Sequence, residues 1–524
     1  MLTRIYGAKC IGVEAVKVTV EVDVCQGIGI HLVGLADIAV KESLLRTTTA
    51  MESLGYHVPG KRIVINLAPA DLHKSGSGYD LPIAIGIIAA SGQHQLPGLD
   101  KYMIMGELGL NGSVRAVPCA LPYAELALGE GFAGIILPEE SALEASAFKD
   151  ISVFGVKTLN DVVTILEEKE DVTGFLIHNT AAYRIARRAG HKQEKDPDIP
   201  DFCDIIGQEV AKRGLEIAAA GGHNVIMVGS PGSGKSSLAK AMAGIMPPMT
   251  REEALTTSKI YSIAGKRDAR CGLMSRRPFR SPHCSSSLPA MVGGGCGDFI
   301  SPGEVSLAHN GILFADEFTQ MPRSVSEALR APIEDRKVVI SRLRNKVEYP
   351  ASFMLVAAAN PCPCGYWGDG DRCTCTPAQR LLYLNRLSGP ILDRIDIQLW
   401  LHRVDSGSII NAPRAESSAE VASRVLKARI IQKDRFAAER NGSPGILTNA
   451  EMNNRQIERY CPLSSACKEM LGRLMESMRL SMRAYFRIIR VARTIADLEG
   501  ADEILSRHLA EAAGYRFLDK GDKL

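Results

Sequence analysis

The sequence lacks a long hydrophobic run. Its longest apolar stretch, from Leu81 to Ala90, is far shorter than the roughly 20 residues that a helix needs to cross a membrane. The first five residues also lack the apolar region of a secretory signal peptide. Val16 to Val24 alternates valine with polar or charged residues and predicts a half-buried strand. We therefore expect neither a signal peptide nor a membrane partner.

The chain has little net charge and no disulfide pattern. Its formal charge is +3, so any surface that binds nucleic acid must be local. Thirteen cysteines, an odd number in 524 residues, argue against a disulfide scaffold and favour a reducing cytoplasm. The hydrophobic content of 46% and charged content of 23% are typical of a globular protein. No short repeat suggests a solenoid, and the length suggests about three domains.

The residue patterns divide the chain into four parts. Residues 1–175 mix short strands with helices and predict an α+β domain, whereas residues 176–201 turn to charge and proline and predict a linker. Residues 202–404 alternate strands with helices, as a parallel α/β core does. Residues 405–524 are strongly helical and predict a lid. The fold class is therefore α/β, with several domains.

A glycine-rich segment follows the apolar run Asn224–Val228 and fits the pattern G-x-x-x-x-G-K-S/T. In this pattern backbone N–H groups surround nucleotide phosphates, the lysine contacts the β- and γ-phosphates, and the hydroxyl holds Mg²⁺. A glycine-rich turn without a ligand is the alternative, but the strand before and the helix after favour a P-loop for ATP. The predicted nucleotide-binding residues are Gly229, Ser230, Pro231, Gly232, Ser233, Gly234, Lys235, Ser236 and Ser237.

Two further strands end in polar residues that suit ATP hydrolysis. Gly311–Phe318 is a buried strand that ends in Asp316, a candidate Mg²⁺ ligand, and Glu317, a candidate base for the attacking water. A strand that merely ends in acids is the alternative, but its place about eighty residues after a P-loop favours the catalytic interpretation. Asn360 ends the third strand and can hydrogen-bond the water or the γ-phosphate. The segment Asp204–Gln208 resembles the adenine-side entry segment of AAA+ proteins.

Two arginines also resemble AAA+ residues. Arg394 resembles an arginine finger, which neutralises transition-state charge at a neighbour's nucleotide, although a surface arginine paired with Asp393 or Asp396 is the alternative. Arg483 falls in a segment that resembles sensor 2, on a helix face with three other arginines. Because an arginine finger acts on a neighbouring subunit, these resemblances imply a ring, and we expect a homo-hexamer.

Four cysteines lie within fourteen residues. Two C-x-C pairs, separated by eight residues, can surround one tetrahedral Zn²⁺ across a flexible glycine-rich span. Unrelated loop cysteines are the alternative. Four protein ligands would leave no open position, so we expect structural zinc in the loop 362–375. The predicted ligands are Cys362, Cys364, Cys373 and Cys375.

Nearly the whole chain resembles the magnesium-chelatase-like AAA+ ATPases of the ComM/YifB family. The matching segments are Phe279–His283, Met291–Gly295, Pro302–His309, Ala359–Gly365, Leu392–Asp396 and Ala484–Leu498. The resemblance implies an ATP-driven ring motor on single-stranded or branched DNA. It implies a branch-migration helicase in recombination and natural transformation, with recombination proteins as possible partners.

A candidate DNA contact precedes the third strand. Residues 336–347 resemble a β-hairpin that points into the pore of ring helicases, where basic side chains can follow phosphates. A solvated hairpin in an ATPase with another substrate is the alternative. The candidate residues are Arg336, Lys337, Arg342, Arg344 and Lys346.

The resemblance also implies a Lon-protease-like fold for residues 1–175. Lon-type proteolysis needs a Ser–Lys pair, and Leu121 falls near the expected lysine. Ser75 or Ser77 paired with Lys74 remains open, but we expect an inactive domain. Two alternatives to a DNA motor therefore remain: a chelatase-type ATPase that remodels a partner for Mg²⁺ insertion, and an ATP-dependent protease.

Overall fold

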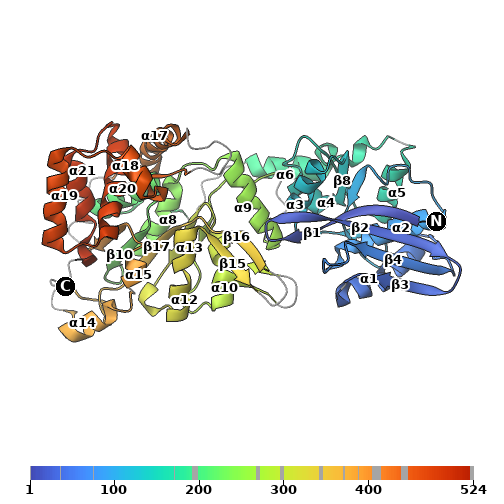
Figure 1. Cartoon of the computed structure of the whole chain (residues 1–524), viewed down its shortest axis with the longest axis horizontal. Coiled ribbons are helices and arrows are strands. Elements are labelled where there is room, and N and C mark those ends of the chain that lie inside the picture. The colour runs from blue at the N-terminus through green and yellow to red at the C-terminus, as the bar shows by residue number, and fades with distance from the viewer. Residues whose placement is uncertain are drawn as a thin grey trace.

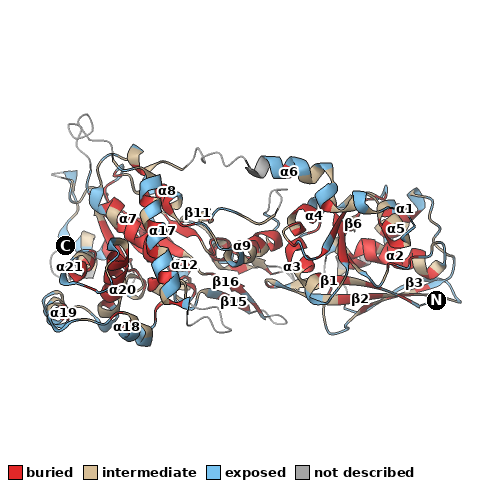
Figure 2. Cartoon of the chain, turned by 90° about the horizontal axis from the view of Figure 1, so that it is seen from above, coloured by how far each residue is buried: buried red, intermediate tan, exposed pale blue. Residues whose placement is uncertain are grey.

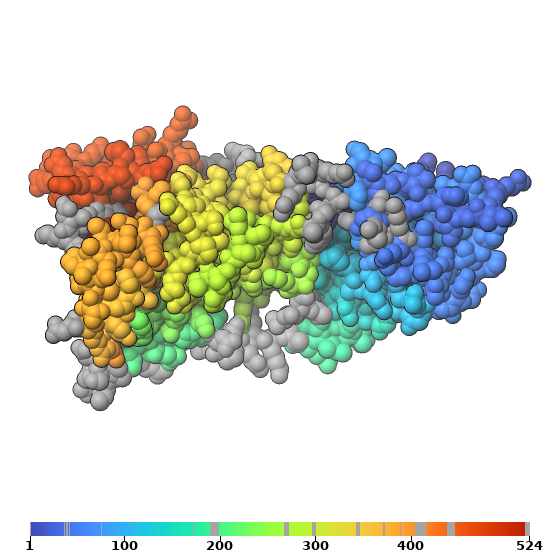
Figure 3. Space-filling view, turned by 90° about the horizontal axis from the view of Figure 1, so that it is seen from below, coloured from blue at the N-terminus to red at the C-terminus, as the bar shows by residue number. Residues whose placement is uncertain are grey.

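The computed structural model describes most of the chain. The described residues are 2–35, 37–74, 76–169, 171–191, 199–266, 272–295, 300–341, 346–369, 372–387, 389–403, 415–437 and 446–519. The N-terminal domain, the α/β core and the helical C-terminal part follow one another along the long axis (Figure 1). The space-filling view shows the same division, from the blue N-terminal end to the orange and red end (Figure 3). None of the helices in the described part combines the length and hydropathy that crossing a bilayer requires.

The N-terminal domain is built on a mixed seven-stranded sheet in the order β3-β4-β2-β1-β5-β8-β9. Its strands are β1 (Leu2–Ile11), β2 (Glu14–Cys25), β3 (Gly29–Val33), β4 (Arg62–Ala68), β5 (Tyr102–Ile104), β8 (Gly134–Pro138) and β9 (Ser152–Val156), beside the small pair β6 (Glu107–Leu108) and β7 (Val114–Arg115). Its helices are α1 (Ile38–Ser53), α2 (Asp80–Ser91), α3 (Ala120–Gly129), α4 (Glu139–Ala145) and α5 (Leu159–Glu167). The strand predicted from the valine alternation is β2, and it is half buried.

The longest apolar run of the chain forms α2, a core helix. It packs on β1 and β2, and most of its residues are fully buried. Gly86 permits this close approach, because a Cβ atom there would lie 2.5 Å from Cγ2 of Val22. Figure 2 shows α2 as one of the buried elements of the domain, whereas α6 (Ala181–His191) is largely exposed. Residues 181–191 thus form a helix within the predicted linker, and it packs against α4 and η3 (Ile177–Asn179).

The α/β core contains a parallel five-stranded sheet in the order β11-β14-β17-β10-β18. Its strands are β10 (Val225–Gly229), β11 (Phe279–Arg280), β14 (Ile312–Ala315), β17 (Met354–Ala359) and β18 (Ile397–Leu401). Its helices are α7 (Glu209–Gly221), α8 (Lys235–Ile245), α9 (Arg251–Ile263), α10 (Leu288–Val292), α11 (Glu304–Leu307), α12 (Arg323–Ala328), α13 (Arg330–Asp335), α14 (Pro377–Leu384) and α15 (Gly389–Leu392). Two antiparallel pairs project from it: β12 (Gly293–Gly294) with β13 (Ser301–Pro302), and β15 (Lys337–Ser341) with β16 (Lys346–Pro350). The parallel α/β core expected from the sequence is confirmed.

The N-terminal domain contacts the core through α9 and the β15–β16 hairpin. Ser262 on α9 donates a hydrogen bond to Glu144 at 2.7 Å, and Lys259 forms an ion pair with Glu125. At the β1–β2 turn, Gly12 has a φ of +61°, and a Cβ atom there would lie 2.9 Å from the carbonyl oxygen of Glu348. The hairpin therefore lies between the two domains.

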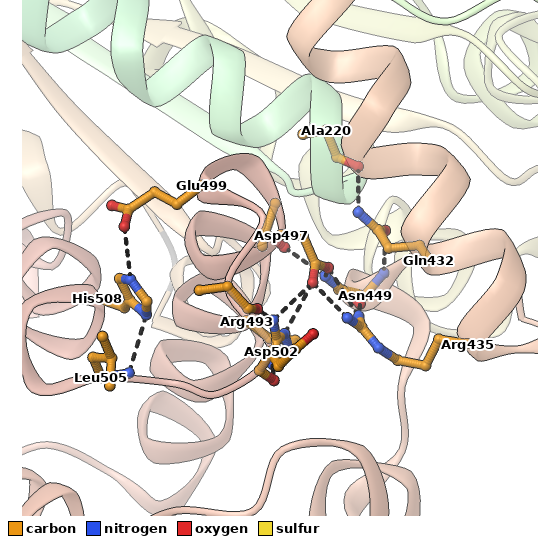
Figure 4. Close-up of polar contacts among 12 residues, drawn as sticks. Ala220, Gln432, Arg435, Asn449, Arg493, Asp497, Glu499, Asp502, Leu505 and His508 are labelled. Carbon is orange, nitrogen blue, oxygen red and sulfur yellow. Dashed lines mark hydrogen bonds and ion pairs between the residues drawn. The ribbon is translucent and has the colours of Figure 1, made fainter.

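The described part of the lid is helical and has a buried polar centre. Its helices are α17 (Ser418–Arg435), α18 (Asn454–Tyr460), α19 (Ser465–Met478), α20 (Met482–Glu499) and α21 (Ser506–Gly514). Asp497 on α20 accepts hydrogen bonds from Arg435 at 2.8 Å, Arg493 at 3.0 Å and Asn449 at 2.7 Å (Figure 4). Because a buried carboxylate needs such partners, this network fixes α20 against α17.

Candidate functional site

The predicted P-loop joins β10 to α8. Gly232 and Gly234 have φ values of +80° and +90°, which glycine adopts without a steric penalty. Lys235 begins α8 and donates hydrogen bonds to the carbonyl oxygens of Gly229 at 2.6 Å and Ser230 at 3.0 Å. Burial lowers the pKa of Lys235, against the opposing effect of nearby carboxylates. A bound phosphate would stabilise the charged form of this amine.

The predicted Mg²⁺ ligands meet across two strands. Asp316 follows β14, and its carboxylate accepts a hydrogen bond from the Ser236 hydroxyl at 3.1 Å. Its other oxygen accepts a hydrogen bond from the backbone N–H of Glu317 at 2.9 Å. A hydroxyl and a carboxylate at this separation are oxygen donors that suit Mg²⁺, which retains several waters. These residues therefore fit a magnesium ion beside the P-loop.

Asn360 completes the predicted group of polar residues. It follows β17, which lies between β14 and β10, and its Oδ1 accepts a hydrogen bond from Lys235 at 3.3 Å. Since the carboxyl ends of parallel strands meet at one sheet edge, one face gathers Lys235, Ser236, Asp316, Glu317 and Asn360. The structure thus brings together residues that lie up to 125 positions apart.

The structure adds one residue that sequence reasoning did not assign, Cys284, and gives the contacts of another that it did, Gln208. The Cys284 thiol donates to Oε2 of Glu317 at an S···O distance of 3.7 Å, so it touches the predicted base. No pattern in the sequence signals this contact, because it depends on the pairing of β11 with β14. Gln208, in the predicted adenine-side segment, donates to the carbonyl oxygens of Ser233 at 3.2 Å and His402 at 2.5 Å. It joins the P-loop to the end of β18.

Arg394 lies at the opposite edge of the sheet. Its carbonyl oxygen accepts a hydrogen bond at 3.0 Å from Asn224, which precedes β10. Its guanidinium donates to the carbonyl oxygen of Pro390 at 2.7 Å and pairs with Glu334 on α13. Glu334 was not anticipated as its partner, because it lies 60 positions away.

The two expected alternative partners of Arg394 bind other arginines. Asp393 lies 3.5 Å from Arg483, and Asp396 pairs with Arg487. Burial alone would raise the pKa of Asp396, but Arg487, His223 and Arg490 together outweigh it and hold that pKa well below its usual range. The Asp396 carboxylate also accepts a hydrogen bond from the backbone N–H of Asn224 at 3.1 Å.

A cavity of about 520 Å³ opens at this amino edge, between the core and the lid. Five arginines line it: Arg336, Arg394, Arg483, Arg487 and Arg490. Three lining carboxylates, Glu334, Asp396 and Glu451, leave an excess of positive charge. Within the described residues, the buried Nε atoms of Arg394 and Arg490 have no hydrogen-bond partner, and burial lowers the pKa of Arg490 to about 10. The arginine cavity therefore suits an anion.

Neither Arg394 nor Arg483 lies at the edge that carries the P-loop of its own chain. In a parallel sheet the amino and carboxyl ends of the strands form opposite edges. One chain thus presents a phosphate-binding loop at one edge and an arginine cavity at the other.

The four predicted metal ligands converge. The ligand atoms of Cys362, Cys364, Cys373 and Cys375 all lie within 4.8 Å of one another. The Cys362 sulfur is 3.3 Å from that of Cys364 and 3.8 Å from that of Cys373. Four sulfurs at about 2.3 Å from a tetrahedral Zn²⁺ are about 3.8 Å apart. The four thiols therefore fit a structural zinc ion.

The five DNA candidates take different positions. Arg336 donates to Ser352 at 2.8 Å and pairs with Glu451 at 2.9 Å, so it lies in the arginine cavity rather than along the hairpin. Lys337 and Lys346 lie on the exposed face of β15–β16, and Lys337 pairs with Glu348 at 3.1 Å. Arg342 and Arg344 lie outside the described residues.

The candidate dyad residues of the N-terminal domain hydrogen-bond to other groups. The Lys74 amine, fully buried, donates to the carbonyl oxygen of Pro69, whereas the Ser77 hydroxyl donates to Glu107. Leu121 is a fully buried core residue of α3. Ser75 lies outside the described residues. These contacts give Lys74 and Ser77 different partners.

Three family models match the chain. They are described as magnesium chelatase subunit ChlI over residues 201–409, subunit ChlI of Mg-chelatase over residues 20–141, and the magnesium chelatase subunit ChlI C-terminal part over residues 415–516. Together they span regions of the N-terminal domain, the core and the lid.

Full-length relatives give the same assignment. The chain is 42% identical to the protein YifB of Salmonella typhimurium, over 99% of this chain and 98% of that protein. It is 41% identical to the competence protein ComM of Haemophilus influenzae, over 98% of this chain and 97% of that protein. A more distant similarity, 26% identity over 61% of this chain and 37% of the other, joins it to the DNA replication licensing factor Mcm6 of Drosophila melanogaster. The chain therefore belongs to the magnesium-chelatase-like ComM/YifB family of AAA+ proteins.

Proposed function

We propose that this chain is an ATP-hydrolysing motor that works as a homo-hexameric ring on single-stranded or branched DNA. The observation that carries the proposal is the pair of complementary half-sites at opposite edges of one sheet. A head-to-tail contact between copies brings the arginine cavity of one chain to the P-loop of the next, and repetition of that contact closes a ring. Each ATP would then lie between two subunits.

The roles in hydrolysis follow from the geometry. The P-loop N–H groups and Lys235 hold the phosphates, while Ser236 and Asp316 hold Mg²⁺, which neutralises phosphate charge when bound. Glu317 takes the proton of the attacking water, and Asn360, hydrogen-bonded to Lys235, orients that water or the γ-phosphate.

The neighbouring subunit completes the site. Arg394 and Arg483 stabilise the negative charge that develops on the transferred phosphoryl group. To do so, Arg394 leaves the carboxylate of Glu334 and binds phosphate oxygens of the ATP held by the adjacent chain. Hydrolysis in the assembled ring should therefore exceed that of an isolated chain.

Two comparisons support DNA as the substrate. One full-length relative is a competence protein, and the distant relative is a DNA replication licensing factor. On this basis we assign the chain to branch migration in recombination and natural transformation, where recombination proteins would be its partners. The exposed lysines of the hairpin, Lys337 and Lys346, are the described candidates for phosphate contacts.

A chelatase-type remodelling ATPase is the second candidate, because the matching family models are described by the ChlI subunit. Steady-state ATP hydrolysis without DNA and with single-stranded, double-stranded or four-way-junction DNA separates the two. A DNA motor predicts stimulation by single-stranded or junction DNA, and hydrolysis that no DNA stimulates contradicts it.

A hairpin variant tests the DNA contact. The double substitution Lys337→Ala and Lys346→Ala should weaken DNA affinity and reduce the salt slope of binding by about 2, one for each lost phosphate contact. Lys17→Ala, in the N-terminal domain, is the control and should leave both unchanged. Unaltered DNA affinity in the double variant would show that these two hairpin lysines do not contact DNA.

A further inference from the structure

The four-cysteine loop lies against the nucleotide site. It starts two residues after Asn360, and at Gly365 it passes the P-loop. Gly365 has a φ of +86°, and a Cβ atom there would lie 3.0 Å from Cγ and Cδ of Pro231. No larger residue fits this approach without moving the loop or Pro231.

The same loop contacts the strand on the other side of the P-loop. Gly368 also has a φ of +86°, and a Cβ atom there would lie 3.0 Å from Cζ2 of Trp400 on β18. Trp367 packs edge-on against Trp400 with ring centroids 5.2 Å apart, and the guanidinium of Arg380 lies 5.5 Å from the Trp367 ring. The loop is thereby packed against the edge strand that pairs with β10.

The helix that follows the loop reaches the segment behind the two acids. Tyr383 on α14 hydrogen-bonds Thr319 at an O···O distance of 2.6 Å, and both residues are buried. Thr319 is two residues beyond Glu317. The cysteine loop and its helix thus connect the P-loop, Asn360 and the segment that follows Asp316 and Glu317.

The four cysteines would let a metal ion close this loop. Cys362 is buried and accepts a backbone hydrogen bond from Trp367 at an N···S distance of 3.4 Å, so the first ligand is tied to the packed aromatic residue. A structural zinc ion in a four-thiolate site stabilises the local fold directly. Without the metal, the four cysteines would no longer be joined, and the contact of Gly365 with Pro231 would lose that support.

We propose that Zn²⁺ bound by the four cysteines stabilises the ATP site. The metal holds Pro231 and Asn360 in the geometry that binds nucleotide. This proposal deepens the function proposed above, because it rests on Gly229–Ser236 binding ATP. It makes metal content and ATP affinity dependent on each other.

The first test removes the metal. Cys373→Ser and Cys375→Ser change the ligands that do not adjoin Asn360, and Cys25→Ser in the N-terminal domain is the control. Bound zinc is measured by mass spectrometry, and affinity by the fluorescence of a labelled ATP analogue with Mg²⁺. We expect zinc to fall from about one equivalent to less than about a fifth. We expect ATP affinity to fall at least about tenfold, because the contact loop is displaced. A folded variant without zinc that binds ATP as the parent does would overturn the proposal.

The second test keeps all four cysteines. Gly365→Ala should retain zinc but weaken ATP binding about tenfold, because its Cβ atom displaces Pro231. Adding Pro231→Gly should recover part of that loss, as a double-mutant cycle measures. Gly92→Ala is the control, because Gly92 has a φ of +75° but no atom within 4 Å of the added Cβ. Parental affinity in Gly365→Ala, or no recovery in the double variant, would refute the contact.

These tests are separable from the proposed function. Both measure binding without DNA, so a failure of DNA stimulation leaves them unaffected. If the parent protein itself binds no ATP, the assignment of the nucleotide site is wrong. If it binds ATP equally well with and without zinc, only the proposed role of zinc is wrong.

Discussion

Mixing two inactive variants tests whether the ATP site is shared between subunits. Arg394→Ala removes the arginine of the amino edge, and Lys235→Ala removes the phosphate contact of the carboxyl edge. Each variant alone should lose hydrolysis, by about 10³-fold or more for the arginine. In rings formed from equal amounts of both, an intact site forms wherever the P-loop of an Arg394→Ala chain meets the arginine of a Lys235→Ala chain. The chain that supplies the P-loop and the chain that supplies the arginine are drawn independently from the equal mixture. Such intact sites therefore make up about a quarter of all interfaces.

The structure predicts that Arg394→Ala folds normally. Its partner Glu334 has a side chain that is 61% exposed, so the ion pair contributes at most about 1 kcal/mol. The hydrogen bond to the carbonyl oxygen of Pro390 contributes about 1 kcal/mol more. The free energy of unfolding should therefore fall by no more than about 2 kcal/mol, which urea denaturation measures.

The assay is steady-state ATP hydrolysis after the two proteins are mixed and allowed to exchange subunits. About a quarter of parental activity per chain is expected when interfaces act independently. A mixture of Lys235→Ala with Glu317→Gln is the matched control: both lesions affect the same edge, so no interface is intact and no activity should return. Activity that stays absent in the Arg394→Ala mixture, although both chains enter one ring, would refute a shared site.

The remaining predictions concern single chains. Lys235→Ala should abolish ATP binding in a nucleotide-binding assay. Glu317→Gln should bind ATP normally but hydrolyse it at least about 10²-fold more slowly in single-turnover measurements. Full turnover in Glu317→Gln would disprove the assignment of Glu317 as the base. Arg487→Ala should lower the free energy of unfolding by about 3–5 kcal/mol at pH 7, because it leaves Asp396 buried and without this partner. Since the pKa of Asp396 is lowered in the folded chain, this stabilisation is present above about pH 4 and is lost as pH falls further, so urea titrations of parent and variant should converge in acid. An unchanged free energy of unfolding in Arg487→Ala at pH 7 would contradict the pairing.

The sequence predicts the carboxyl-edge site well because each of its parts is local. The P-loop is a short pattern between a strand and a helix, and the acids and Asn360 each follow a buried strand. Parallel pairing of those strands then brings their ends together, so the order of motifs suffices to predict that Lys235, Ser236, Asp316 and Asn360 meet. The four cysteines are equally local, and the structure gathers them as expected.

The amino edge could not be predicted in the same way. Arg394 pairs with Glu334 and Arg336 with Glu451, partners that lie 60 and 115 positions apart. No periodicity signals such pairs, because they depend on how α13 and the lid pack around the sheet. The sequence accordingly assigned Arg336 to the DNA hairpin, whereas the structure places it in the arginine cavity.

The predicted linker shows how composition hides a helix. Arg184, Arg187 and Arg188 make residues 181–191 appear as a charged connector. In the structure these arginines lie on the exposed side of α6, while Ala186 is buried against the N-terminal domain. The helix is amphipathic, and its narrow apolar face was outweighed by the charges around it.

Movement of DNA tests the central claim most directly. A labelled four-way junction is incubated with the parent protein or Glu317→Gln, and the separated duplex products are followed by gel electrophoresis. The account predicts ATP-dependent separation by the parent and none by Glu317→Gln or with a non-hydrolysable ATP analogue. If the parent hydrolyses ATP but leaves the junction intact at every DNA and protein concentration, the chain is not a branch-migration motor.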